Sequence, residues 1–392
     1  MPVINRIADL QDDAVEWRHD YHGHPELLYD VKRTAADVAK KLRAFGCDEV
    51  AEGIGRIGVV GVLRGSGGGS GPVIGLRADM DALPIVEESG KPWASTVPGK
   101  MHACGHDGHT TMLLTAARYL AETRRFRGTA IFIFQPAEEG GAGARAMVED
   151  GLMERFGIEE VYCLHNFPGI PVGNFGIRPG LMMASSDQFT LEIEGRGAHA
   201  ARPHESIDVI AASTAIVQEF QSIVARNVDP LASAVVSVTT IHAGDTAFNV
   251  LPPRATITGT ARALDPAVRD LLERRLGEIA RGVADGYGAK TNFHYLSNYP
   301  MVSNHAEQTK KAIAVASEVA GAANVDTDVT PIMGGEDFSF MLHARPGAFI
   351  FMGNGDTAGL HHPAYDFSDE AIPYGASYWA TLVESLMPVH PT

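Results

Sequence analysis

Cysteine is scarce in this sequence, and its scarcity excludes one class of protein. The 392 residues contain three cysteines, Cys47, Cys104 and Cys163, so any disulfide would leave one thiol unpaired. A small secreted scaffold held together by disulfides has more cysteines, usually in an even number. We therefore expect a protein of a reducing compartment, the cytoplasm.

Long apolar runs are missing as well. No stretch of about eighteen apolar residues suggests a transmembrane helix, and the N-terminal segment lacks the apolar core of a secretory signal peptide. We therefore expect a soluble, cytoplasmic protein that has no membrane partner.

Basic residues are fewer than acidic ones. Lysine and arginine together number 32 and aspartate and glutamate 48, which gives a net charge of −16 at pH 7. A chain with this charge repels phosphate backbones, so nucleic acid is not expected as a partner. Hydrophobic residues make up 45% and charged residues 20%, close to globular averages, which argues against a disordered or fibrous chain.

Length and apolar pattern together indicate two domains. A chain of 392 residues is too long for one ordinary core. Near the N-terminus, apolar residues at helical spacing predict two helices, after which short apolar strands alternate with helices, as in an α/β sheet. The same alternation returns after Asn304, with a helix over 306–320 and a strand over 348–352.

The stretch between these two parts has a different pattern. From Ser185 onward, strands alternate strictly between apolar and polar residues, and helices are predicted over 207–224 and 266–283. An antiparallel sheet with helices on one face produces this pattern. The expected domains are a discontinuous α/β catalytic domain with a mixed sheet flanked by helices, 1–183 and 295–392, and an inserted α+β domain with an antiparallel sheet, 184–294.

Acidic and imidazole side chains follow several predicted strands at the point where each strand ends. Three apolar runs lead directly into such side chains: 73–76 into Asp79 and Asp81, 131–134 into Glu138 and Glu139, and 161–164 into His165. Ligand crevices of α/β sheets form at strand ends. The three runs therefore indicate a single crevice lined by these side chains.

Two more clusters add cysteine and histidine. Cys104 and His106 stand two residues apart at the start of a predicted helix, and His361 and His362 lie near the C-terminus. Cysteine, histidine and carboxylate side chains are the ligands expected for Zn²⁺, Mn²⁺, Co²⁺ or Ni²⁺. Any one of these residues alone fits an ordinary helix cap or turn, but five clusters together favour a metal site.

Glu138 and Glu139 form an adjacent carboxylate pair. Two carboxylates this close do not both stay ionised without nearby positive charge, and a metal ion supplies that charge. One can bind metal while its neighbour takes the proton from a metal-bound water, as metal-assisted hydrolysis requires. On a surface helix the pair would only be solvated, but the apolar run before it indicates a buried strand end.

Sequence motifs along nearly the whole chain resemble one family of metallohydrolases. This is the hippurate hydrolase and N-acyl-amino-acid amidohydrolase branch of the two-domain, two-metal aminoacylase and carboxypeptidase metallopeptidases, and the plant indole-3-acetyl-amino-acid hydrolases look like the same branch. The motifs, in the family's order, are 24–27 (HPEL), 77–84 (RADMDALP), 101–109 (MHACGHDGH), 135–140 (QPAEEG), 164–166 (LHN), 195–204 (GRGAHAARPH), 249–252 (NVLP), 333–338 (MGGEDF) and 360–363 (LHHP).

The resemblance implies a centre of two divalent ions per subunit, Zn²⁺, Mn²⁺, Co²⁺ or Ni²⁺. Its implied ligands are Cys104, His106, Glu139, His165 and His361. His361 is chosen over His362 because the family's motif places the ligand two residues before the proline. Cys104 stands where related enzymes have a bridging carboxylate, and a thiolate can also bridge two divalent ions.

Catalytic and supporting roles follow from the same resemblance. Glu138 is implied as the general base and acid. Asp81 is implied to orient a metal-ligating imidazole from behind, which suits a buried carboxylate. Related aminoacylases have a histidine ligand at the position of Asp79, so contact between Asp79 and metal stays open.

Three residues of the inserted domain are implied to hold the substrate. His199 aligns with a histidine that helps to hold the carbonyl oxygen, often from a neighbouring subunit, although its spacing also fits a turn residue. Asn249 and Arg262 are candidates for gripping the substrate carboxylate, which suits the two-pronged donors of arginine.

The implied activity is metal-dependent hydrolysis of the amide bond of N-acyl amino acids such as hippurate or N-acetyl amino acids. The products are a carboxylic acid and a free amino acid. A dipeptidase or carboxypeptidase of the same family is one alternative, and a relative that kept the fold but lost turnover is another. The resemblance also implies a homodimer or homotetramer, with the inserted domain as its lid and dimerisation domain.

Overall fold

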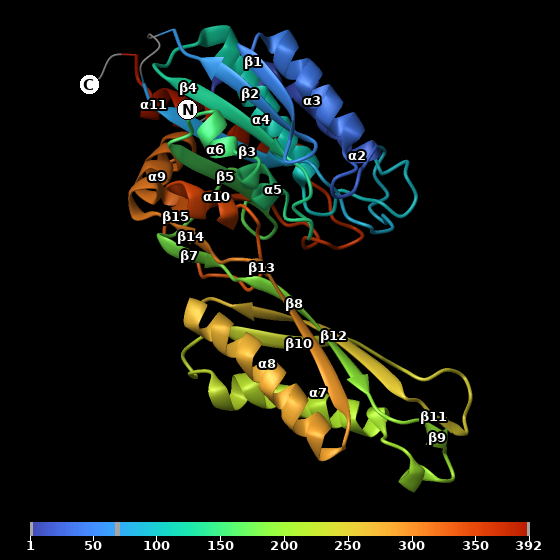
Figure 1. The fold of residues 1–392 in the computed structure, drawn as a ribbon. Helices are drawn as coiled ribbons and strands as arrows, with labels where there is room; N and C mark the ends of the chain where they lie inside the picture. Colours follow the sequence, from blue (N-terminus) through green and yellow to red (C-terminus); the bar gives the residue numbers. More distant parts are fainter. Residues whose placement is uncertain (1–2, 67–70, 390–392) are drawn as a thin grey trace. The chain divides into compact units, whose positions relative to one another are not determined.

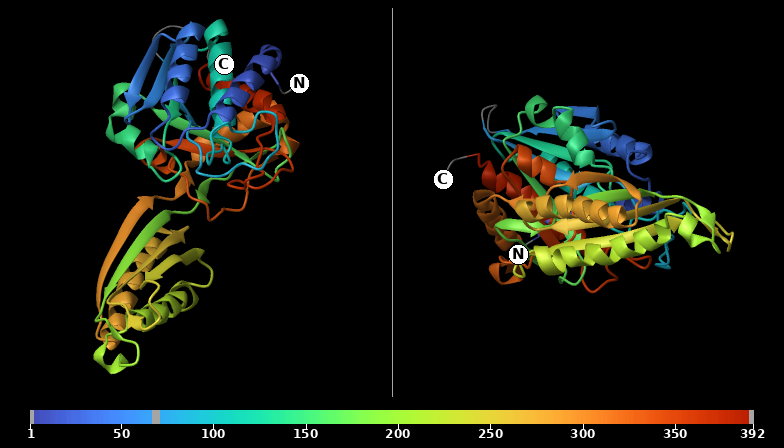
Figure 2. Two further views of the ribbon diagram at one scale, coloured as in Figure 1. Left: turned by 90° about the vertical axis from the view of Figure 1, so that its right-hand side faces the viewer. Right: turned by 60° about the horizontal axis from the view of Figure 1, so that its bottom comes forward.

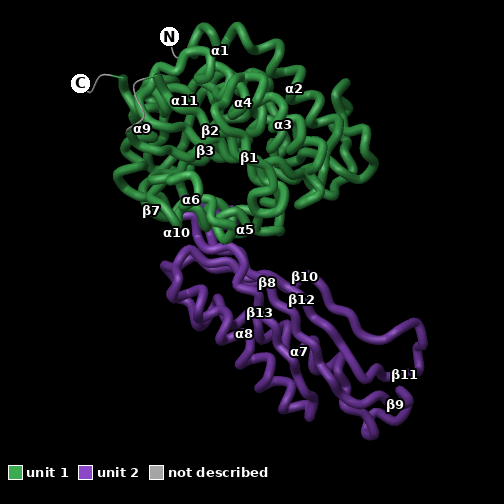
Figure 3. Tube along the Cα trace, turned by 45° about the horizontal axis from the view of Figure 1, so that its top comes forward, with its two compact units in different colours: residues 1–182, 303–330, 337–392 green, residues 183–302, 331–336 purple. Residues whose placement is uncertain are grey.

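The chain divides into two compact units (Figure 3). Unit 1 comprises residues 1–182, 303–330 and 337–392, and unit 2 comprises 183–302 and 331–336. The structure, a computed structural model, describes residues 3–66 and 71–389. Within these ranges, no helix combines the length and apolar character needed to cross a membrane.

Unit 1 is built on an eight-stranded mixed sheet (Figure 1). In order across the sheet, its strands are β1 (Glu49–Ile54), β2 (Gly58–Arg64), β4 (Thr129–Gln135), β3 (Val73–Asp79), β5 (Glu160–Phe167), β16 (Gly347–Gly353), β6 (Phe175–Gly176) and β15 (Val325–Asp326). The central strands β4, β3, β5 and β16 pair in parallel, while β1–β2, β2–β4 and β16–β6 pair antiparallel. These central strands are buried almost throughout, as strands covered on both faces must be.

Helices cover both faces of this sheet (Figures 1 and 2). They are α1 (Asn5–Asp9), α2 (Gln11–Gly23), α3 (Lys32–Phe45), α4 (His106–Thr123), α5 (Gly143–Glu149), α6 (Leu152–Arg155), α9 (Ala306–Ala320), α10 (Ser339–Ala344) and α11 (Ile372–Leu386). Two glycines of β2 show the two faces, since a Cβ at Gly61 would meet Leu42 of α3 and a Cβ at Gly58 would meet Met147 of α5. Helix α4 packs against α2, α3, α11 and β3, so most of its side chains are buried.

Unit 2 contains a four-stranded antiparallel sheet with two helices on one face (Figure 1). The strands, in order, are β10 (Ala234–Ala243), β12 (Arg254–Ala263), β8 (Ser186–Glu194) and β13 (Lys290–Tyr299), and the helices are α7 (Val209–Asn227) and α8 (Pro266–Gly286). Leu191 and Ile193 of β8 are buried in one core with Ile216 of α7 and Leu276 of α8. The polar residues between them face away, which explains the strict alternation in the sequence. The predicted fold class, a mixed sheet with flanking helices plus an antiparallel sheet, is confirmed.

The remaining elements are short. They are β7 (Gly180–Met183), β9 (Ala198–His199), β11 (Val250–Leu251), β14 (Val302–Asn304) and three 3₁₀ turns, Pro203–Glu205, Ala322–Asn324 and Asp369–Ala371. β9 pairs with β11 and β7 with β14.

Unit 2 extends beyond the segment 184–294 that the sequence pattern suggested. Strand β13 continues to Tyr299, which pairs with Ser186 of β8. Residues 331–336 also group with this unit, because the backbone N–H of Ala184 lies 3.1 Å from the carbonyl oxygen of Ile332 and 2.9 Å from that of Gly334. Such long-range backbone pairing leaves little trace in local periodicity.

Candidate metal centre

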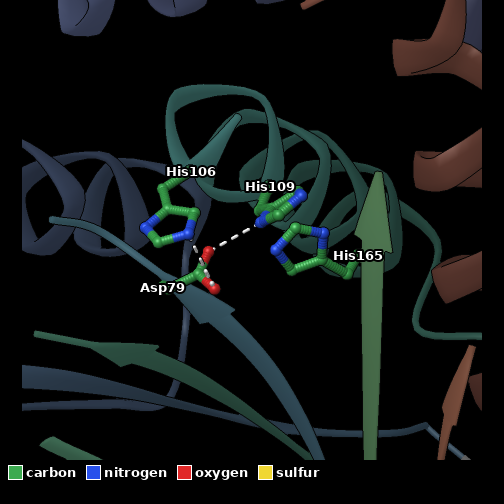
Figure 4. Close-up of side chains that lie close together, drawn as sticks. All are labelled: Asp79, His106, His109 and His165. Atoms are coloured by element: carbon green, nitrogen blue, oxygen red, sulfur yellow. Dashed lines mark hydrogen bonds and ion pairs between the residues drawn. The ribbon is translucent and has the colours of Figure 1, made fainter. Parts of the chain in front are cut away.

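The candidate site of unit 1 forms at the carboxyl ends of parallel strands. β3 ends at Asp79, which lies opposite Gln135, the last residue of β4, and His165 lies near the end of the neighbouring β5. Helix α4 begins at His106 on the same side of these strands (Figure 4). The strand ends predicted from sequence therefore do meet in one place.

All five predicted ligands belong to overlapping clusters whose ligand atoms lie within 4.8 Å of one another. Cys104, Glu139 and His361 form one cluster, and His106, Glu138 and Glu139 form another. A third cluster joins His165 to His106, together with Asp79 and His109 (Figure 4). The Sγ of Cys104 lies 3.6 Å from Nε2 of His165, which connects the first cluster to the third.

Both buried histidines of the predicted ligand set point Nε2 into this cluster. His106 Nδ1 lies 2.7 Å from the backbone oxygen of Asp81, and His165 Nδ1 lies 2.7 Å from the backbone oxygen of Asn166. A carbonyl can only accept, so each Nδ1 carries a proton, and in the neutral imidazole each Nε2 keeps a lone pair. Metal-ligating histidines show this arrangement, with the second ring nitrogen fixed by a hydrogen bond.

Two buried atoms of the site lack hydrogen bonds. Among the described residues, neither Nε2 of His106 nor Oε1 of Glu139 makes a hydrogen bond, although the two atoms are only 3.9 Å apart. Oε1 also lies within ion-pair distance of Nε2 of His361, at 3.3 Å. A buried polar atom without a partner costs about 1 to 3 kcal/mol. A divalent cation between the two atoms would satisfy both, so the residues present fit a metal ion.

Charge at the site points the same way. Burial opposes protonation of His106, but the nearby negative charges of Asp79 and Asp81 outweigh it and raise its pKa to about 10. Burial also opposes ionisation of Glu139, yet its contacts with His361 and the charge of His106 hold its pKa below the usual value. The ionised carboxylates around His106 therefore favour a positive charge at this place. A divalent cation would supply that charge in place of the proton on His106.

The neighbouring imidazole of His165 behaves in the opposite way. Burial lowers the pKa of His165 well below its usual value. A neutral imidazole is the form that binds metal.

Glu138 and Glu139 owe their position to a sharp turn after β4. Pro136 follows the last strand residue, and Ala137 adopts a left-handed backbone with φ of 55°. The carboxylate of Asp81 accepts the backbone N–H groups of both glutamates, at 2.9 and 3.1 Å. Asp81 is fully buried and also lies 3.6 Å from Nδ1 of His106, behind that imidazole as the sequence comparison suggested.

Asp79, whose contact with metal was left open, has both oxygens occupied. Oδ1 lies 2.7 Å from Nδ1 of His109, and Oδ2 accepts from Nη1 of Arg77 at 2.8 Å. Oδ2 also lies 3.5 Å from Nε2 of His106 (Figure 4). These contacts favour a supporting role behind the ligands.

Of the two adjacent histidines near the C-terminus, His361 lies at the site. Its Nε2 is 3.3 Å from Oε1 of Glu139, and its backbone N–H donates to the carbonyl of Ala103 at 2.7 Å. Among the described residues, His362 belongs to none of the clusters, and its Nδ1 accepts the backbone N–H of Ala364. The side chain of His361 is 53% exposed, so the site is open to solvent on this side.

The three predicted substrate residues belong to unit 2. His199 of β9 is exposed and pairs with Val250 of β11, so it lies beside Asn249, whose carbonyl accepts from Ala200. Arg262 lies at the other end of the sheet, near Asp187, and is half-buried. The structure thus brings His199 and Asn249 together but not Arg262, and their role toward substrate stays a prediction.

Sequence reasoning missed a layer of buried polar residues beneath the site. Asp337 accepts from Arg77 at 3.1 Å and from Gln135 at 2.8 Å, and Asn166 contacts His109 and Tyr365. Asn166 carried a signal, because it stands next to His165 in the matched 164–166 motif. Arg77 and Asp337 also stand in matched motifs, 77–84 and 333–338, but a motif does not reveal which residues its members contact.

Comparison with known proteins agrees with this geometry. Residues 75–385 match Peptidase family M20/M25/M40. The chain is 44% identical over 382 residues to the hippurate hydrolase of Campylobacter jejuni, covering 97% of this chain and 98% of that protein. It is 39% identical over 373 residues to the N-acetylcysteine deacetylase of Bacillus subtilis, covering 94% of this chain and 95% of that protein.

A solved structure resembles the whole chain. The crystal structure of a dinuclear metal binding peptidase of the M20 family from Bacillus subtilis superimposes with a TM-score of 0.82 at 34% identity. The match covers 97% of this chain and 99% of that one. The family resemblance inferred from the motifs is confirmed.

Proposed function

The chain belongs to peptidase family M20/M25/M40, and from this we propose that it hydrolyses the amide bond of N-acyl amino acids in a metal-dependent reaction. The products are a carboxylic acid and a free amino acid. One observation carries the proposal: the five clustered ligand residues lie beside Glu138 in a chain similar along its length to hippurate hydrolase.

The ligands that would hold the metal ions come from four segments of unit 1. They are Cys104, His106, Glu139, His165 and His361. Their thiolate, imidazole and carboxylate groups suit two ions of Zn²⁺, Mn²⁺, Co²⁺ or Ni²⁺. Bound ions would supply positive charge that polarises the amide carbonyl. The same charge would lower the pKa of the attacking water, so that a general base can deprotonate it.

Glu138 is the proposed general base and acid. The residue is 7% exposed, and its carboxylate belongs to one cluster with His106 and Glu139. In the proposed reaction Glu138 takes a proton from the attacking water and passes it to the amide nitrogen, which leaves as the free amine. Asp81 accepts the backbone N–H of Glu138 and so fixes the main chain that carries the base.

Unit 2 is proposed to act as a lid and dimerisation domain, with His199 holding the substrate carbonyl and Asn249 and Arg262 its carboxylate. A homodimer or homotetramer is proposed as well. Strand β10 forms an edge of the four-stranded sheet, and a second copy could extend such an edge. A cytoplasmic location is supported by the cysteines, since no disulfide forms among the described residues.

The proposed function is tested by hydrolysis of hippurate and of N-acetyl amino acids. Protein loaded in turn with manganese, cobalt, nickel or zinc is compared with a chelated sample. We expect release of the free amino acid that disappears on chelation. No release of either substrate class by protein shown to contain metal would overturn the proposal.

A further inference from the structure

Asn166, to which no role has been assigned so far, contacts two of the five proposed metal ligands. It follows His165 in β5 and is fully buried. Its side-chain Nδ2 donates to the backbone oxygen of Cys104 at 2.6 Å, and its backbone oxygen accepts from Nδ1 of His165 at 2.7 Å. One residue therefore holds the main chain of one proposed ligand and the ring of another.

The amide of Asn166 is itself fixed from two sides. The hydroxyl of Tyr365 donates to Oδ1 at 2.7 Å, and Tyr365 is fully buried. On the other side, Nε2 of His109 lies 2.9 Å from both Nδ2 and the backbone nitrogen of Asn166. With one acceptor contact and two donor contacts, the amide has a single possible orientation.

These contacts also determine which ring nitrogen of His109 carries the proton. Its Nε2 accepts from Asn166, so its Nδ1 must carry the proton that it donates to Asp79 at 2.7 Å. His109 therefore has no free lone pair for a metal, although it lies in the cluster drawn in Figure 4. It connects Asp79 to Asn166 and so belongs to the support of the ligands.

Gly105, between Cys104 and His106, packs closely against the side-chain amide of Asn166. Gly105 has a φ of +88°, and a Cβ there would lie 2.2 Å from Nδ2 of Asn166 and 2.6 Å from the hydroxyl of Tyr365. Only glycine brings the backbone this close, and the close approach allows Asn166 to reach the carbonyl of Cys104.

We propose that Asn166 is a positioning residue of the metal centre, which holds Cys104 and His165 with their ligand atoms facing each other. This inference rests on the proposed function, since it presumes that these side chains bind metal. Residues that orient metal ligands from behind affect metal affinity by about 10- to 100-fold, and the same range is expected here.

The test measures metal binding directly. Asn166→Ala and the parent protein are titrated with Co²⁺ and Zn²⁺ against a chromophoric chelator, and the absorption spectrum of each Co²⁺ form is recorded. We expect Asn166→Ala to bind about 10- to 100-fold more weakly. Its Co²⁺ spectrum should change as well, because the amide no longer holds the main chain of Cys104, while the backbone contact to His165 is kept. Tyr365→Phe, which removes a single hydrogen bond, should shift both readouts in the same direction by less.

Asn304→Ala is the matched control. Asn304 is a buried asparagine of the same unit, and its side chain makes three hydrogen bonds to backbone groups of Arg178 and Phe349. It should lose stability without a change of metal affinity or spectrum. If Asn166→Ala does not fold, Tyr365→Phe carries the test alone.

Two results would overturn the inference and can be told apart. If folded Asn166→Ala and Tyr365→Phe both keep the metal affinity and the Co²⁺ spectrum of the parent, Asn166 is not a positioning residue. The proposed function would be unaffected by that result. A parent protein that binds no divalent ion would remove both.

Discussion

The carboxylate of Asp81 accepts a hydrogen bond from the backbone N–H of Glu138 at 2.9 Å. Its other oxygen accepts from the backbone N–H of Glu139 at 3.1 Å. A single buried carboxylate thus fixes both the proposed base and the proposed ligand next to it. Burial raises the pKa of Asp81, while these hydrogen bonds and His106 favour its ionised form.

Asp81→Ala should therefore weaken metal binding and turnover together, each by about 10- to 100-fold. Two backbone N–H groups would lose their acceptor and the turn that carries Glu138 would loosen. Asp81→Asn keeps one acceptor oxygen and should fall between the parent and Asp81→Ala. Metal titration and hippurate hydrolysis measure the two effects, and unchanged values in both would rule out this role.

Glu138→Gln should lower the turnover rate by about a hundredfold or more, because the amide cannot take the proton from water. The metal content should stay at the parental value, since Glu138 is not among the five proposed ligands. Glu139→Gln is the comparison, and it should lower the metal content instead. Turnover and metal analysis on the same samples separate the two roles, and parental turnover of Glu138→Gln would refute the assignment.

Gly105→Ala should be far more damaging than alanine at another left-handed glycine. Gly46 has nearly the same φ, +91°, but a Cβ there would meet nothing within 4 Å. Gly46→Ala should cost about 1 kcal/mol of unfolding free energy, from backbone strain alone. Gly105→Ala adds the clash with Asn166 and Tyr365, so a loss of about 2 to 4 kcal/mol and weaker metal binding are expected. Urea denaturation of both variants would show whether the costs differ, and equal costs would contradict the packing described for Gly105.

The stability of the protein should depend on the charge of His22. Burial opposes its protonation, but the charge and hydrogen bond of Asp107 outweigh burial, and with Glu87 they raise the pKa of His22 to about 9. Because the folded-state pKa is raised, the stabilisation is fully present below the unfolded pKa of about 6.5 and is lost as pH rises through about 9.

His22→Gln should thus be less stable than the parent at pH 6 by up to about 3 kcal/mol, and this difference should narrow by pH 9.5. Urea denaturation of chelated protein across this pH range measures it. His24→Gln, at an exposed histidine nearby, should not reproduce the effect. A difference that stays constant from pH 6 to 9.5 would disprove the linkage.

Local patterns in the sequence predicted much of the fold. The helix predicted over 306–320 is α9, because its apolar face packs on the sheet and leaves a clear periodicity. The alternation of β8 revealed a one-faced sheet for the same reason. Strand ends followed by carboxylates and imidazoles led to the candidate site, since parallel strands bring their carboxyl ends together.

The support beneath the site could not be predicted, because it depends on contacts between distant segments. Tyr365 and Asn166 are 199 positions apart in the chain but share a hydrogen bond. Nothing in the local pattern around either residue indicates the other. The same applies to Arg77 and Asp337, which are 260 positions apart.

The order of the ligands along the chain has a consequence for how the protein is made. All of unit 2 lies in sequence between His165 and His361, although it contributes none of the five proposed ligands. During synthesis, domains fold as units in order of their emergence. The nascent chain therefore has to include the whole of unit 2 before its last ligand exists. The first four ligands are therefore synthesised together, and the fifth can join them only after unit 2 has been made.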